Sequence, residues 1–353
     1  MSLITLLMVF LLPDELTLER AKESLCRVEM GFWNPDEQRY SLYADAFSPS
    51  AHLWDTGIVL AAYAAWTKLD RTMAMARIDR WLLSHEDYWL EAGPVSGYNP
   101  GPDSTKVDRY YDDNAWVVLA LLEAYEHTQH RAYLDQALKV HYFVMSGEDD
   151  KLGGGIYWHE SKQTKNTCGN ANTAVSAYKL YRATKDHRFR AQGDRILDWM
   201  EKLRAPNGLY WDHIQLDGKI EKTLWSYNAA LPIRAWLERY RITDDPADLN
   251  QAVRTARAAR VQWMDKETGH IRCDASFAHH LTDAWIELEA FHHRGKWAES
   301  ARQALDSAWD LTQNERGFFG PRWDRPFAEP RSQLLWSASV ARGWASLAAA
   351  QPR

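Results

Sequence analysis

Helical segments recur along this chain at a nearly constant spacing, and this repeat limits the fold more than any other feature. Apolar periodicity predicts twelve helices, near residues 14–30, 53–69, 71–84, 112–127, 131–146, 170–184, 187–203, 225–240, 246–264, 278–294, 296–313 and 333–350. Every second helix has a polar or aromatic start, and these starts recur every 52 to 59 residues, at Asp55, Asp113, Asn172, Asn228, His280 and Trp336. A repeat of this length indicates an array of helical hairpins.

The two helices of each pair differ in composition. One is apolar on most faces and rich in small residues, as in TGIVLAAYAAW at 56–66, which is typical of a helix surrounded by neighbours. The other carries one apolar stripe and a charged face, as in RFRAQGDRILDWMEKL at 188–203. Segments rich in glycine and aromatic residues, such as GLYWDHIQLDGK at 208–219, precede the apolar helices and indicate short hairpins on one rim. We therefore predict an all-α (α/α)6 toroid of six helical hairpins with short β-hairpins in its rim loops, with an open solenoid as the alternative.

The composition excludes several classes of protein. With 46% hydrophobic and 25% charged residues, the chain should form an ordered core and should be neither disordered nor embedded in a membrane. The net charge of −6 and the lack of a long Lys/Arg cluster argue against a nucleic-acid partner. The three cysteines are far apart, so neither a disulfide framework nor a zinc site is indicated. The 18 tryptophans and 16 tyrosines must fill a core or present flat faces to a ligand, and sugar rings are one such ligand.

The first 13 residues form an apolar segment of their own. Its core, LITLLMVFLL, follows no Lys or Arg, lacks a clean small-residue cleavage site and is too short to span a bilayer. We therefore expect a cytoplasmic protein without a membrane span, or a periplasmic or secreted one if this segment acts as a signal. Residues 14–353 are expected to form a single domain, and the protein is expected to be a monomer.

Two adjacent carboxylates, Asp112 and Asp113, immediately precede the apolar run NAWVVLALLEAY at 114–125. They belong at the start of an inner helix, where Asp112 could be the N-cap and Asp113 a first-turn residue favoured by the helix dipole. Alternatively, because adjacent helical side chains diverge by about 100° from Cα atoms about 3.8 Å apart, their oxygens can lie roughly 5 Å apart. That separation suits a retaining glycosidase, in which one carboxylate attacks the anomeric carbon and the other group protonates the leaving oxygen.

These carboxylates are part of a longer resemblance. The strings YYDDNAW at 110–116, GGGIYW at 153–158, KNTCGNAN at 165–172 and LWSYNAA at 224–230 look like motifs of glycoside hydrolase family 76. The resemblance runs in order from about residue 54 to 340, and the paired aspartates are its most specific element. That family is built on the (α/α)6 fold and is known for endo-acting α-1,6-mannanases.

The resemblance implies a retaining glycoside hydrolase that acts on α-1,6-linked mannan or mannooligosaccharides. Asp112 would be the nucleophile and Asp113 the general acid/base of a double displacement through a covalent glycosyl-enzyme. The partner would be an oligo- or polysaccharide, and interception of the intermediate by a sugar would give transglycosylation. The family implies neither a metal nor an organic cofactor.

Other residues near the starts of inner helices are candidates for sugar binding. Asn170 and Asn172 match the family's asparagine pair, although either can cap a helix. Trp158 follows three glycines, which favours a loop that brings the ring against a sugar. Lys165 and Asn166 also match the family, but we expect this lysine to be solvated. The remaining candidates, for whose rings core packing is the alternative, are Trp54, Asp55, Tyr227 and Asn228.

Two other classes of function fit parts of the sequence. A sugar epimerase or isomerase resembling the acylglucosamine 2-epimerase family would use histidines at inner-helix starts for proton transfer, and His279 and His280 lie at one such start. Against it, the last inner helix begins RSQLLWS, without a histidine, and no third ligand suggests a metal at this pair. In a noncatalytic glycan-binding toroid, Asp112 and Asp113 would only cap their helix.

Overall fold

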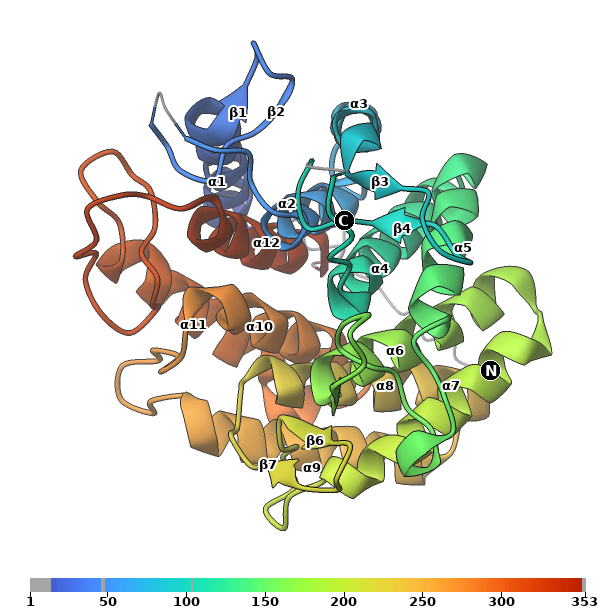
Figure 1. The fold of residues 1–353 in the computed structure, drawn as a ribbon. Coiled ribbons are helices and arrows are strands. Elements are labelled where there is room, and N and C mark those ends of the chain that lie inside the picture. The colour runs from blue at the N-terminus through green and yellow to red at the C-terminus, as the bar shows by residue number, and fades with distance from the viewer. Residues whose placement is uncertain (1–13, 46–47, 103–104, 351–353) are drawn as a thin grey trace, which may run out of the picture.

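A closed ring of six helices forms the inside of the molecule (Figure 1). The structure, a computed structural model, describes residues 14–45, 48–102 and 105–350, so the apolar segment at 1–13 lies outside the described residues. Each inner helix packs against the next inner helix along the chain, and the last packs against the first, which closes the ring. These helices are α2 (Leu53–Trp66), α4 (Tyr111–Thr128), α6 (Thr167–Thr184), α8 (Tyr227–Thr243), α10 (Ala275–Glu289) and α12 (Leu334–Ala350).

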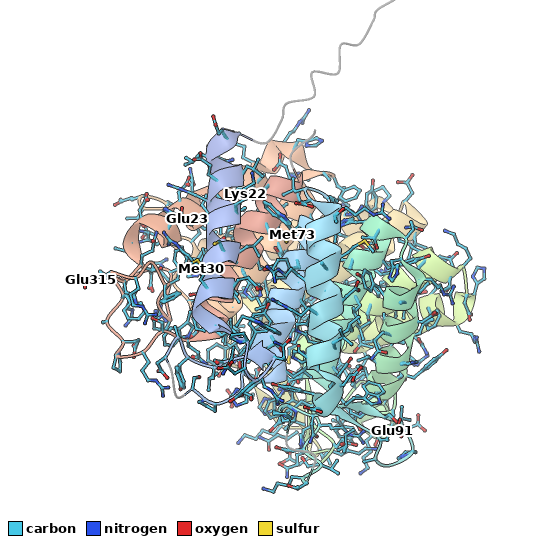
Figure 2. All side chains as sticks on the ribbon, turned by 90° about the horizontal axis from the view of Figure 1, so that it is seen from above. Lys22, Glu23, Met30, Met73, Glu91 and Glu315 are labelled. Atoms are coloured by element: carbon cyan, nitrogen blue, oxygen red, sulfur yellow. The ribbon has the colours of Figure 1, made fainter. Side chains whose placement is uncertain are left out.

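A second set of helices surrounds this ring. The outer helices are α1 (Glu15–Phe32), α3 (Arg71–Ser84), α5 (Arg131–Met145), α7 (His187–Met200), α9 (Pro246–Trp263) and α11 (Trp297–Leu311). Helix α1 packs on α12, and each of the others packs on the inner helix that precedes it in the chain. Their sequences explain the arrangement, because each buries an apolar stripe and leaves a polar face in water. In Figure 2, Lys22, Glu23 and Met30 are labelled on α1, and all three are exposed to solvent.

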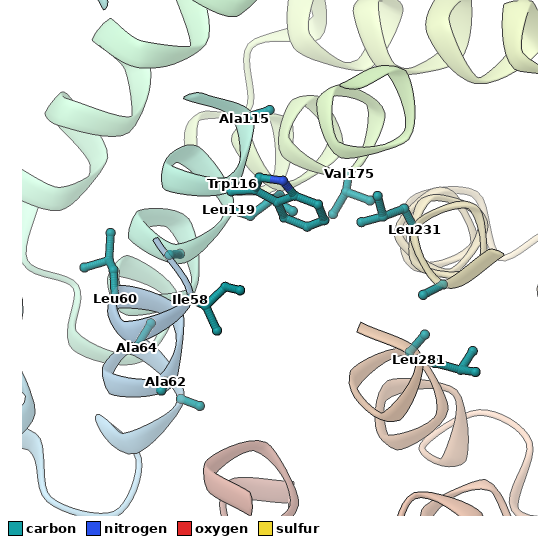
Figure 3. Close-up of a cluster of buried hydrophobic side chains, with 14 of the residues drawn as sticks. Ile58, Leu60, Ala62, Ala64, Ala115, Trp116, Leu119, Val175, Leu231 and Leu281 are labelled. Carbon is teal, nitrogen blue, oxygen red and sulfur yellow. The ribbon is translucent and has the colours of Figure 1, made fainter. Parts of the chain in front are cut away.

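The inner helices are packed on both sides, which matches their sequences. Helix α2 has no charged residue after Asp55, and small residues such as Ala62 and Ala64 let neighbouring helices approach closely. Figure 3 shows side chains of these helices, with the ring of Trp116 extending from α4 toward the barrel axis. Leu231 of α8 is completely buried, so its replacement by alanine should cost about 2–5 kcal/mol of stability.

Short turns connect inner helices to outer helices at one end of the barrel, which we call the base. Gln129, Lys185 and Asp244 each follow an inner helix in a left-handed conformation, with φ of 57°, 62° and 54°. One further residue then leads into the next helix, and two of these residues, Asp186 and Asp245, cap α7 and α9 through their side chains. The same compact turn therefore recurs in three of the hairpins.

Longer segments lead from outer to inner helices at the opposite end, which we call the mouth. In the described residues they form three small antiparallel sheets. One sheet joins two neighbouring segments, since Asn166 pairs with His213 and Thr164 with Gln215. The inner-helix N-termini therefore all face the mouth. The strands are β1 (Trp33–Asn34), β2 (Arg39–Tyr40), β3 (Trp89–Leu90), β4 (Gly97–Tyr98), β5 (Thr164–Asn166), β6 (His213–Gln215) and β7 (Ile220–Glu221).

The predicted toroid is confirmed, and the contact between α12 and α2 excludes the open solenoid. Each of the twelve predicted helices occurs, with differences at some ends. The helix predicted at 278–294 is α10, which begins three residues earlier because Asp274 accepts a hydrogen bond from the Ser276 backbone at 2.8 Å. It also ends sooner, and a 3₁₀ turn at His293–Gly295 follows. Along the described ranges, no helix is both long and apolar enough to cross a membrane.

Charged side chains from several inner helices meet at the base of the ring and neutralise one another. Arg342 contacts Glu123 at 2.9 Å and Asp283 at 2.8 Å, while Arg234 contacts Glu287 at 2.8 Å. Burial raises the pKa of Glu287, but the positive charges of Arg234 and Lys179 and the hydrogen bond from Arg234 together outweigh burial and lower that pKa to about 2. The rest of this base cluster consists of Glu126, Lys179, Arg182 and Glu238. Most of the cluster lines a cavity of about 880 Å³.

Candidate active site

Asp112 and Asp113 lie in the first turn of α4, at the mouth. The helix begins at Tyr111, and its N-cap is Tyr110, whose side chain makes no capping hydrogen bond. The interpretation of Asp112 as an N-cap is therefore wrong. A backbone contact holds the helix start instead, because the Tyr111 N–H donates to the carbonyl oxygen of Trp158 at 2.9 Å. Neither carboxylate therefore occupies the N-cap position of α4.

The two oxygens of Asp112 have different surroundings. Oδ2 accepts a hydrogen bond from the indole N–H of Trp158 at 2.8 Å and one from the thiol of Cys168 at 3.4 Å. Oδ1 is buried and has no hydrogen-bond partner among the described residues. Burial raises the pKa of Asp112 to about 6, and the donors from Trp158 and Cys168 limit this rise. The carboxylate therefore receives side-chain hydrogen bonds at one oxygen, while its other oxygen is buried without a side-chain partner from the described part of the chain.

The carboxyl group of Asp113 lacks such donors. It is half-buried, and no hydrogen bond or ion pair joins it to the residues that the structure describes. Burial raises the pKa of Asp113 well above its usual value, and the negative charges of Asp112, Asp55 and Asp108 raise it further. Because Asp112 receives donors that favour its ionised form and Asp113 does not, the two environments favour protonation of Asp113 over protonation of Asp112.

A cavity of about 570 Å³ opens beside the pair. Aromatic rings form a continuous wall, in which Phe277 stacks on Tyr227 with centroids 4.3 Å apart and on Trp54 at 5.8 Å. Trp158 packs edge-on against Tyr110 at 5.0 Å. A cavity of this size, with flat rings and a few polar groups, suits a sugar ring. Its lining consists of Trp54, Tyr110, Asp112, Asp113, Trp116, Trp158, His159, Ser161, Gln163, Thr164, Asn166, Asp212, His213, Tyr227 and Phe277.

The residues predicted to bind substrate are divided by the structure into two groups. Those that line the cavity with the acid pair are Trp54, Trp158 and Tyr227. Asp55 does not, because it accepts a hydrogen bond from the His52 backbone N–H at 3.0 Å at the start of α2. Asn170 is also outside the lining, since its amide group pairs with the backbone N–H and C=O of Ile156 at 2.7 and 2.9 Å. Both residues hold mouth segments in place.

The two other predicted asparagines, Asn172 and Asn228, are fully buried and do not line the cavity. The amide of Asn172 has no hydrogen-bond partner in the described residues. Asn228 donates from Nδ2 to Asp212 Oδ1 at 2.9 Å, and the other oxygen of Asp212 lies 2.9 Å from His213 Nδ1. Asp212 and His213 do line the cavity. The sequence analysis missed both residues because they lie in a hairpin at the mouth and not at the start of an inner helix. The aromatic residues of that hairpin were the signal that could have indicated them.

Lys165 is buried, so the expectation that it is solvated is wrong. Its Nζ lies 2.7 Å from Asp149 Oδ1 and donates to the carbonyl oxygen of Gly154 at 2.7 Å. Lys165 is buried because the glycine-rich loop folds over it, and the carboxylate of Asp149 and the carbonyl oxygen of Gly154 compensate its positive charge. Lys165 therefore anchors the loop that carries Trp158, and the neighbouring Asn166 lines the cavity.

His279 and His280 lie inside the ring and do not line the cavity. The ring of His280 stacks on Trp116 with centroids 4.2 Å apart. Burial lowers the pKa of His279 to about 3 and that of His280 well below its usual value. Neither histidine therefore shares the mouth cavity with Asp112 and Asp113. The described ranges also hold no group of three His, Cys, Asp or Glu side chains placed to bind a metal ion.

Comparisons with known proteins agree on one family. A sequence model of glycosyl hydrolase family 76 matches residues 17–307. Comparison with curated protein sequences gave no match. The solved structure of a family 76 α-mannanase from Bacteroides thetaiotaomicron is 29% identical in sequence and superposes with a TM-score of 0.89. The matched region covers 94% of this chain and 95% of that chain.

Two structures of an α-1,6-mannanase from Salegentibacter share the fold at 19% identity, each over 94% of this chain and 99% of the other. One superposes with a TM-score of 0.82. The second, with a TM-score of 0.81, is an inactive variant in which two consecutive aspartates are replaced by asparagine, in complex with α-1,6-mannotriose. Because the family match covers most of the chain, this protein is a glycoside hydrolase and belongs to glycosyl hydrolase family 76.

Proposed function

We propose that the protein is a retaining hydrolase of α-1,6-linked mannan or mannooligosaccharides. The observation that carries this proposal is the unequal environment of two adjacent carboxyl groups. Asp112 accepts hydrogen bonds from Trp158 and Cys168, which favour its ionised form and suit a nucleophile, whereas Asp113 has a raised pKa and no donor, which suits an acid. The two structures of the α-1,6-mannanase from Salegentibacter, one of them an inactive variant bound to α-1,6-mannotriose, support the choice of substrate.

The proposed reaction has two displacement steps. First, a carboxylate oxygen of Asp112 attacks the anomeric carbon while Asp113 transfers its proton to the glycosidic oxygen, so that this C–O bond breaks and a glycosyl ester forms. Then Asp113, now ionised, takes a proton from water as the water oxygen attacks the anomeric carbon and releases Asp112. Two inversions retain the configuration. Hydrogen bonds from Trp158 and Cys168 keep Asp112 oriented and stabilise its charge as it leaves.

The test compares Asp112→Asn and Asp113→Asn on α-1,6-mannooligosaccharides. Both variants should lose at least about 10³-fold in kcat/KM, because each reaction step uses both groups. An aryl mannoside with a good leaving group separates the two roles, since it needs no proton in the first step. With that substrate Asp113→Asn should still form the glycosyl-enzyme, and Asp112→Asn should not. Asp135→Asn, on the outer surface of α5, is the matched control and should keep wild-type activity.

Three results would contradict the proposal. Wild-type hydrolysis by both asparagine variants, with normal circular dichroism, would show that the pair is not catalytic. If NMR shows that the inverted anomer is released first, the double displacement is excluded. A wild-type enzyme that cleaves another mannosidic linkage but not the α-1,6 linkage would refute the proposed substrate.

A further inference from the structure

Trp158 and Trp225 are the two exposed tryptophans in the part of the chain that the structure describes, each with 40% relative exposure. Trp158 is accounted for by its hydrogen bond to Asp112. Trp225 makes no such contact, because no described residue accepts a hydrogen bond from its indole N–H. A single exposed ring is common on protein surfaces, so the position of Trp225 must carry the argument.

Trp225 immediately precedes Ser226, the N-cap of α8, at the mouth. Its backbone is held in place because the hydroxyl of Ser226 donates to the buried thiol of Cys273 at 3.3 Å. The ring of Trp225 packs against Phe277 with centroids 5.5 Å apart and an interplanar angle of 56°. Phe277 lines the cavity, whereas Trp225 lies outside the lining. The aromatic wall formed by Tyr227 and Phe277 is therefore continued past the edge of the cavity by one exposed ring.

A glycan that extends out of the cavity along this aromatic wall passes Trp225. We infer that Trp225 is a specificity-determining residue, whose face stacks on a pyranose ring of the oligosaccharide beyond the sugars bound in the cavity. This inference rests on the proposed function and adds a preference for longer chains. Short substrates do not reach Trp225. Binding energy from a remote sugar can be used to orient the scissile bond, so the contact should raise kcat/KM with chain length.

The experiment measures kcat/KM for α-1,6-linked mannose oligosaccharides from the disaccharide to the hexasaccharide. Trp225→Ala should lower kcat/KM by about tenfold on the longest substrates, which matches the strength of one aromatic stacking contact, and leave the disaccharide unaffected. Trp225→Phe keeps a ring and should recover most of the loss. Leu216→Ala is the matched control, because Leu216 is 41% exposed in the hairpin that precedes Trp225 and offers no ring. It should keep the wild-type dependence on length.

The outcomes separate this inference from the proposed function. If the wild type cleaves none of these substrates, the proposed function is wrong and the inference falls with it. If the wild type cleaves them and Trp225→Ala keeps the same dependence on chain length, the inference alone is wrong. An equal loss on every substrate would also overturn it, because Trp225 would then act on the fold or on the acid pair.

Discussion

The mouth and the base of this barrel both contain buried acids, sometimes on the same helix. Helix α4 carries Asp112 and Asp113 at its start and Glu123 near its end. At the base, Glu123 faces the guanidinium of Arg342, and although burial raises the pKa of Glu123, the charge and hydrogen bond of Arg342 together with the other nearby basic groups leave that pKa lowered. At the mouth no cation faces the pair within the described residues, and both pKa values are raised. The difference lies in the partners, because burial acts in the same direction at both ends.

Cavity volume alone would place the active site at the base and not at the mouth. The cavity at the base is about 880 Å³ and the one at the mouth about 570 Å³. The acids of the base cluster are paired with arginine and lysine, which is typical of a structural network. At the mouth, two carboxyl groups without a cationic partner face aromatic rings. Such groups lower the stability of a protein and are typical of catalytic sites.

Among the changes that test this difference between the mouth and the base, we expect the largest effect from a substitution at the base. Arg342→Met should lower the free energy of unfolding by about 3–5 kcal/mol, because it leaves Glu123 and Asp283 buried without their cation. Urea titration measures the change. Arg131→Met is the control, since the exposed pair of Arg131 with Asp135 should contribute about 0–1 kcal/mol. Equal losses in the two variants would mean that the base cluster does not stabilise the ring.

At the mouth, loss of one donor should change chemistry more than stability. Trp158→Phe keeps a ring but removes the N–H that donates to Asp112, so kcat/KM should fall by about 10- to 100-fold, as expected for a hydrogen bond to a charged group. Without this donor the pKa of Asp112 rises, and the acidic limb of the pH profile should move to higher pH. An unchanged acidic limb would show that Trp158 does not stabilise the ionised form.

A smaller effect concerns the stability of the acid pair itself. The pKa of Asp113 is higher in the folded protein than in the unfolded chain, so its contribution to stability is complete below about pH 4 and is lost as the pH rises. Asp113→Asn cannot ionise and should raise Tm by about 2–4 °C near pH 8. The gain should shrink toward pH 4. Calorimetry across this range measures it, and a loss of Tm at pH 8 would refute the argument.

The smallest effect is expected from a carboxylate near the pair. The negative charge of Asp55 helps to raise the pKa of Asp113. Asp55→Asn removes this charge and keeps an oxygen that can accept from the His52 N–H. The basic limb of the pH profile should therefore move to lower pH, while its acidic limb stays in place. A shift of both limbs would indicate a structural disturbance of α2.

Local sequence predicted the barrel well, because helix periodicity and capping are local properties. The turns at Gln129, Lys185 and Asp244 were not predicted, since a left-handed conformation in residues other than glycine has no strong local signal. The sequence predicted a closed ring, but its period alone could not exclude an open solenoid, because the contact between α12 and α2 joins segments far apart in the sequence.

The site was harder to predict where side chains depend on distant partners. Motifs indicated Asp112, Asp113 and Trp158, which lie together at one cavity. The motifs did not show that Asn170 lies outside the cavity lining, where its amide oxygen accepts a hydrogen bond from the backbone N–H of Ile156. Nor could they show that Cys168 donates to Asp112, because that contact depends on how α6 packs beside α4.

The contact that closes the ring also bears on how the chain folds. Helix α12 packs on both α10 and α2, so the first inner helix lacks one neighbour until the last one has been synthesised. Contacts between residues so far apart in the sequence form slowly, and a partial ring exposes apolar surface that chaperones would need to cover. Once complete, the ring has no terminal helix pair from which unfolding could spread, unlike an open solenoid. Closure should therefore make unfolding cooperative, with all six hairpins lost together.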